Sequence, residues 1–191
     1  MGVTAVRAEG DSGQVLSDVG TYSIDARAAR IASLREAYKI KLDDKEKALV
    51  ISRCQGAQTS LEKISSKLVS IKSDREKSYS ATISTLIQLK SLISAKGIDT
   101  SSMDLLIVSY QQKKAIFDGS MRAYELALED ATTIGCANAP EDFRAALEGV
   151  RAARKPVVEV SSQINELTRS SLKNTFDAIR LKLQTGASTN G

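Results

Sequence analysis

The segment from residue 22 to residue 96 contains no proline and a single glycine, Gly56. Apolar side chains recur along it in alternating steps of four and three residues, the spacing with which one helix packs along another. This predicted seam consists of Val50, Cys54, Ala57, Leu61, Ile64, Leu68 and Ile71. A turn-rich β fold needs frequent proline and glycine, so a stretch of this kind restricts the chain to an all-α architecture.

The composition agrees with packing between helices. Prolines occur only at Pro140 and Pro156, and aromatic residues make up 4% of the chain against 42% hydrophobic residues in total. The 27 basic and 23 acidic residues are interleaved, which is typical of solvated helix faces. A nucleic-acid surface would need basic residues gathered on one face, usually with stacking aromatics, so we expect no nucleic-acid partner.

We predict helices over residues 23–96, 102–133 and 140–184. They would form one domain, residues 22–184, folded as an elongated antiparallel three-helix bundle with a very long first helix. Residues 1–21 contain four glycines and no periodic apolar pattern, and residues 185–191 are small and polar, so both ends are predicted to be disordered tails.

Around Gly56 a second topology competes with the first. Residues 59–62 read Thr-Ser-Leu-Glu, the form of a capping box, and Gly56 could end a helix, which would give an up-down four-helix bundle. The seam keeps its phase through Gly56, however, and an interior glycine costs only about 1 kcal/mol. We therefore favour a continuous helix.

The helix predicted over residues 102–133 carries the most regular heptad pattern. A buried stripe is expected at Met103, Ile107, Tyr110, Phe117, Met121, Tyr124, Leu128 and Ala131, interrupted by Lys114. Gly97 marks the turn before this helix, and Pro140 suits the first position of the next one. Pro156 lies inside the last helix and is expected to kink it near residues 152 and 153.

The chain has two cysteines, Cys54 and Cys136. In either topology the antiparallel arrangement brings them to the same end of the bundle, so a disulfide between them is predicted. Residues 3–5 (Val-Thr-Ala) and 6–8 (Val-Arg-Ala) resemble the small-residue pattern that precedes a signal-peptidase cut, with the signal peptide already removed. Together these features favour an extracytoplasmic protein, and no run is apolar and long enough for a transmembrane segment.

The chain contains no histidine. Ser-His-Asp and Cys-His catalysis, histidine zinc sites and di-iron bundle sites are therefore excluded, and neither a phosphate-binding glycine loop nor a Cys-x-x-Cys motif occurs. We predict that the protein is not an enzyme. We also predict no cofactor, no metal site and no small-molecule substrate.

Several short motifs resemble a family of uncharacterised secreted helical proteins of the Patescibacteria, a group of candidate-phylum bacteria. They are Arg53-Cys54, residues 96–101 (Lys-Gly-Ile-Asp-Thr-Ser), and Cys136 followed by residues 143–147 (Phe-Arg-Ala-Ala-Leu) and 150–154 (Val-Arg-Ala-Ala-Arg). The resemblance covers roughly residues 50–183. It implies export, a disulfide between the two cysteines and no established activity; Pro156 departs from the pattern.

A narrow apolar stripe in the first predicted helix is the candidate interaction site. It consists of Ile31, Leu34, Tyr38, Leu42 and Leu49. If the first helix is continuous, this arm projects about 40 Å beyond the bundle and its stripe needs a partner: a second copy, a client or another envelope protein. The expected function is a structural spacer or protein-interaction module at the cell envelope, and the alternative is a periplasmic holdase-like chaperone.

Overall fold

The computed structural model describes the backbone of residues 15–187 and the side chains of residues 25–184. This part of the chain is all-helical and contains no strand. The elements are α1 (Val15–Ala37), α2 (Asp44–Ser94), α3 (Ser101–Thr133), α4 (Pro140–Glu166), a π-helical turn η1 (Leu167–Ser171) and α5 (Leu172–Ala187). The predicted all-α class is confirmed.

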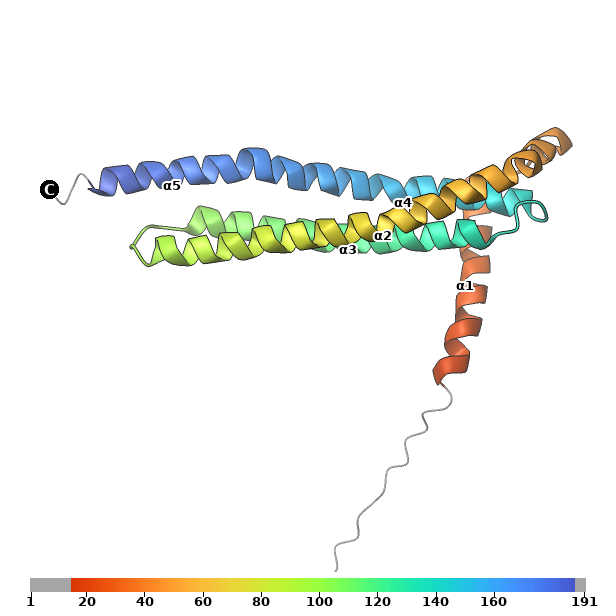
Figure 1. Ribbon diagram of the computed structural model, residues 1–191, viewed down its shortest axis with the longest axis horizontal. Helices are drawn as coiled ribbons and strands as arrows, with labels where there is room; N and C mark the ends of the chain where they lie inside the picture. Colours follow the sequence, from red (N-terminus) through yellow and green to blue (C-terminus); the bar gives the residue numbers. More distant parts are fainter. Residues whose placement is uncertain (1–14, 188–191) are drawn as a thin grey trace, which may run out of the picture.

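The bundle is built from α2, α3 and the continuous path of α4, η1 and α5 (Figure 1). α2 and α3 are antiparallel and joined by a short loop, and α4 packs chiefly on α3. α2 has 51 residues, which corresponds to a length of about 76 Å at 1.5 Å per residue. α1 does not extend α2 but runs steeply across one end of the bundle (Figure 1).

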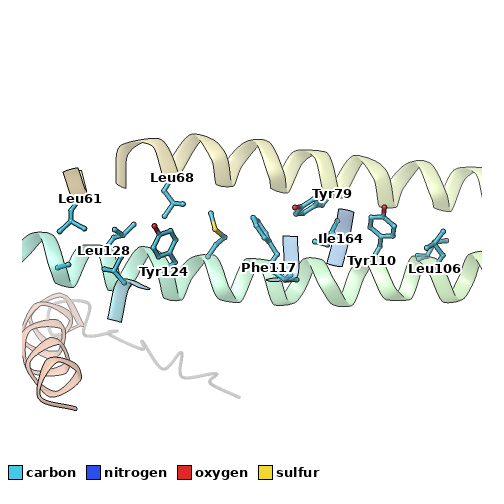
Figure 2. Packing of buried hydrophobic residues seen from close by; sticks show 14 of the residues in the cluster. Leu61, Leu68, Tyr79, Leu106, Tyr110, Phe117, Tyr124, Leu128 and Ile164 are labelled. Carbon is cyan, nitrogen blue, oxygen red and sulfur yellow. The ribbon is translucent and has the colours of Figure 1, made fainter. Parts of the chain in front are cut away.

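Buried side chains line the space between α2, α3 and α4 (Figure 2). Every apolar residue of the predicted α3 stripe is buried, with Met103, Leu128 and Ala131 fully so. Tyr79 of α2 meets Phe117 edge to face, with ring centroids 5.2 Å apart. The predicted α2 seam is only partly right, because Leu61 and Leu68 are buried while Ile64 and Ile71 are 41% and 51% exposed.

The prediction of a single helix over residues 23–96 is wrong, because the chain turns at residues 38–43. Lys39 has a positive φ of 50°, which ends the α1 helix. Asp43 then starts α2 with a capping box: its carboxylate accepts from the Glu46 amide at 2.8 Å, and the Glu46 carboxylate accepts from the Asp43 amide at 2.9 Å. The alternative turn near Gly56 is also wrong, since Gly56 lies inside α2.

The ends of the predicted domain shift as well. Residues 15–21 belong to α1 and residues 185–187 to α5, although both ranges were predicted as tails. Residues 1–14 and 188–191, including the suggested signal-peptidase motifs, lie outside the described residues. The chain stays α-helical through Pro156, and the irregular turn η1 follows eleven residues later, at Leu167.

Cys54 of α2 and Cys136 of the α3–α4 loop lie at disulfide distance, with their Cα atoms 5.7 Å apart. This agrees with the predicted bond. The side-chain amide of Gln58 adds a second link, donating to the Ile134 carbonyl at 3.0 Å. The base of the α2–α3 hairpin is therefore held by a covalent bond and a hydrogen bond, while a turn with Gly97 at φ 72° closes its tip.

Candidate interaction surface

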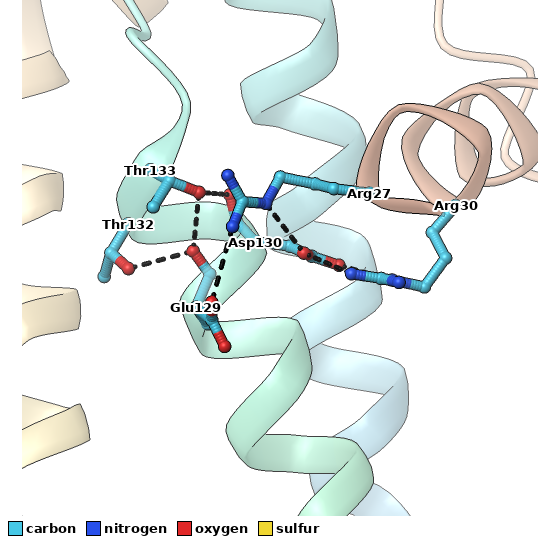
Figure 3. Close-up of polar contacts among 6 residues, drawn as sticks. All are labelled: Arg27, Arg30, Glu129, Asp130, Thr132 and Thr133. Carbon is cyan, nitrogen blue, oxygen red and sulfur yellow. Dashed lines mark hydrogen bonds and ion pairs between the residues drawn. The ribbon is translucent and has the colours of Figure 1, made fainter. Parts of the chain in front are cut away.

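A buried carboxylate on α3 fixes the position of α1. Asp130 is 3% exposed and accepts two hydrogen bonds from Arg30, at 2.8 and 2.7 Å, and one from Arg27 at 3.3 Å (Figure 3). Arg27 also reaches Glu129 at 3.4 Å. A paired guanidinium and carboxylate satisfy each other's donors and acceptors, so this cluster acts as a clamp between α1 and α3.

The clamp also favours the charged form of Arg30. The hydrogen bond to Asp130 raises the pKa of Arg30 above its ordinary value, partly opposed by burial and supported by the charges of Asp130 and Glu129. The guanidinium is therefore firmly charged. Because Asp130 is almost fully buried, removal of the arginines would leave an uncompensated charge inside the protein.

α1 packs mainly against α4. Ile31 is 6% exposed, and Leu34 packs partly buried against the core. Gly149 of α4 makes this approach feasible, because a Cβ at that position would lie only 2.8 Å from Cδ1 of Leu34. The local sequence of α4, with Ala145 and Ala146 also buried, provides the flat surface on which α1 crosses.

A groove of about 540 Å³ opens where α1, α3 and α4 meet, and we call it the crossing groove. Its walls are mostly apolar, with the Arg30–Asp130 pair among them. The lining residues are Ala29, Arg30, Ser33, Leu34, Ala123, Leu126, Ala127, Asp130, Ala146 and Gly149. An apolar groove with a few polar groups is the usual form of a site that takes a side chain or small apolar group.

The crossing groove is continuous with a second apolar line on α3, on the side opposite the buried stripe. We call this line the outer seam; it consists of Leu105, Val108, Gln112, Ile116, Gly119, Ala123 and Leu126. These positions follow one another in steps of three and four, so they share one face of the helix. Its four large apolar side chains are 40–72% exposed.

The stripe predicted as the interaction site is divided by the turn at residues 38–43. On α1, Ile31 is buried and Leu34 is partly buried against the core. Tyr38 and Leu42 lie in the turn, and Leu49 is on α2. Tyr38 and Leu49 are 43% and 50% exposed. The prediction of one continuous stripe on a projecting arm is therefore wrong, because it required a helix that does not break.

A second ionic cluster holds this turn against α4. Arg35 contacts Glu141 at 2.7 Å and Asp142 at 3.0 Å, and Lys47 lies 3.5 Å from Glu141. A hydrogen bond from the Leu42 amide, followed by the charges of Lys47 and Arg35, lowers the pKa of Glu141, although burial opposes this shift. The cluster gathers α1, the turn, α2 and the start of α4 at one point.

No group of histidine, cysteine and acidic residues suited to a metal ion occurs within the described residues. In the same part of the chain, no helix is long and apolar enough to cross a membrane. Comparison of the sequence with family models, curated proteins and solved structures gave no match in any of the three.

Proposed function

We propose that the protein is an extracytoplasmic, non-enzymatic helical module that acts at the cell envelope by binding another protein. The single observation that carries this proposal is the outer seam of α3. Soluble proteins expose scattered apolar residues, but a line of them in regular helical spacing is typical of a surface that another element covers.

The remaining observations concern rigidity and compartment. The hairpin of α2 and α3 gives the molecule an elongated body. A long, rigid body with a binding surface along it suits a spacer between components of the envelope. Disulfides such as the one between Cys54 and Cys136 form and persist in oxidising compartments, which supports export. The resemblance to secreted helical proteins supports export as well. The holdase alternative has less support, because the apolar stripe expected to grip a client is divided, with Ile31 buried and Leu34 partly buried against the bundle.

Site-specific photocrosslinking in the native cell tests the interaction. A photoreactive residue in place of Ile116, on the outer seam, should give a discrete protein adduct. The same residue in place of Val69, which is 66% exposed on α2, is the matched control and should give none. Equal adducts from both positions, or none from either, would contradict a dedicated protein-binding surface.

Thiol trapping tests the compartment separately. Cells lysed under denaturing conditions in excess alkylating reagent, so that the buried Cys136 is also accessible, should yield protein in which Cys54 and Cys136 are both unmodified. Alkylation of both cysteines in freshly lysed cells would show that the bond is absent in the native compartment and would contradict export.

A further inference from the structure

We propose that the outer seam of α3 binds an amphipathic helix of another protein, one whose apolar stripe is flanked by acidic residues. This inference deepens the proposed function, and it rests on that function. The exposed apolar line by itself indicates only that a protein binds there. The spacing and the charges around the line indicate the shape and the charge of that partner.

The shape follows from the spacing of the seam. From Leu105 to Leu126 the seam positions follow one another in steps of three or four, which is the pattern that receives a second helix running alongside. This distance corresponds to about 32 Å, or three heptads of a partner helix. Gly119 faces open space, with nothing within 4 Å of a Cβ placed there, so a partner backbone can approach closely at the centre of the seam.

The crossing groove marks where the partner ends. α1 lies across the seam beyond Leu126, held by the clamp at Asp130, and blocks further extension in that direction. The groove can receive one large apolar side chain from the last turn of the partner helix. Anchor residues of this kind, seated in a pocket at the end of a flat contact, provide much of the affinity in helix-in-groove complexes.

The charge of the partner follows from the ion pairs of α3. All five acidic residues of the helix are engaged within the protein. They are Asp104 with Lys90, Asp118 with Lys114, Glu125 with Lys72, Glu129 with Arg27, and Asp130 with Arg27 and Arg30. Among the described residues, Lys113 and Arg122 are the two charges of α3 that have no such partner.

Lys113 and Arg122 border the outer seam on opposite sides. Lys113 follows Gln112 and Arg122 precedes Ala123, so each is turned about 100° from a seam position, in opposite directions. A helix laid on the seam would therefore find a cation on each flank, and acidic flanking residues would complement both.

A second copy of this chain fits the same surface less well. Self-pairing of two outer seams would bring together four cations, two from each copy, while every carboxylate of α3 is already paired. The overall formal charge of +4 adds to this repulsion. A foreign acidic helix is the occupant that the charges favour.

Two synthetic peptides test the inference on the full chain. The first has three heptads with leucine at the first and fourth positions and glutamate at the fifth and seventh; the second replaces glutamate by lysine. By fluorescence anisotropy at low ionic strength, the glutamate peptide should bind about tenfold more tightly or better. Ile116→Glu should abolish binding, and the control Val69→Glu should leave it unchanged.

Charge reversal completes the test, because Lys113→Glu together with Arg122→Glu should invert the peptide preference. Circular dichroism of each variant checks that the fold is retained. Equal binding of both peptides, or no binding, would overturn the acidic-helix inference. A dimer by mass measurement that Ile116→Glu dissociates would overturn it in favour of a second copy. If photocrosslinking at Ile116 still captures a protein, the proposed function survives either result.

Discussion

Loss of the Cys54–Cys136 disulfide should lower the free energy of unfolding by about 4 kcal/mol. The two cysteines are 82 residues apart, and the chain-entropy relation assigns about 4.5 kcal/mol to closing a loop of that size in the unfolded chain. For a protein of this length, such a loss corresponds to a decrease of about 10 °C or more in the melting temperature.

Urea unfolding followed by circular dichroism measures this effect. Oxidised wild type is compared with wild type under reducing conditions, and the two differ only in the bond. The variant Cys54→Ala with Cys136→Ala should resemble the reduced protein and be insensitive to reductant. Cys136 is fully buried, so the variant also loses some packing and should be slightly the less stable of the two.

The location of the effect is equally specific. Hydrogen exchange should accelerate first in residues 134–139, where the disulfide and the Gln58 hydrogen bond hold the loop on α2. The turn around Gly97, at the far end of the hairpin, should change little. A reduced protein within about 1 kcal/mol of the oxidised one would refute the assignment of this bond as a major constraint on the unfolded chain.

Three further predictions concern the clamp, the hairpin tip and the crossing of α1. Asp130→Ala should cost about 1–2 kcal/mol after allowance for the partial exposure of its arginines, and hydrogen exchange should show faster opening of α1 alone. The pKa of Asp99 is lowered from 3.8 to about 2, chiefly by a hydrogen bond from the backbone amide of Ser101. The carboxylate therefore stabilises the fold above about pH 4, and this stabilisation is lost as the pH falls toward 2. Asp99→Asn should therefore lower the melting temperature at pH 6, with the difference from wild type disappearing near pH 2; a constant difference would contradict this origin. Gly149→Leu should displace α1 and expose it to proteolysis, while α2–α4 still melt cooperatively. As a control, Gly119→Ala, at a position that faces open space, should raise the free energy of unfolding by up to about 1 kcal/mol. Equal protease resistance in the two variants would argue against close packing at the crossing.

The sequence by itself determined the elements whose signals are local. The heptad pattern of α3 places Tyr110, Phe117 and Tyr124 on one face of the helix. It therefore fixes which face of α3 is buried in the core. Pro140 and Gly97 likewise act on their own backbone, and they correctly placed the start of α4 and the turn before α3. The cysteine pairing followed once these segments were known to be antiparallel.

The turn at residues 38–43 had a local signal that was not recognised. Asp43 and Glu46 form the same capping box that was considered near Gly56, and here it starts a helix. No glycine or proline accompanies it, and the positive φ falls on Lys39, a residue type with no special preference for that conformation. The similar signals near Gly56, by contrast, lie inside α2, where the helix continues.

Only the tertiary structure decided where α1 lies. Its position depends on Arg30 and Asp130, which are 100 residues apart, and on a glycine of α4 that admits Leu34. Helical periodicity reports which residues of one segment share a face, but not which distant segment covers that face. The same limit explains the candidate site: the residues of the outer seam are visible in the sequence, yet their exposure is known only once α2 and α4 occupy the other sides of α3.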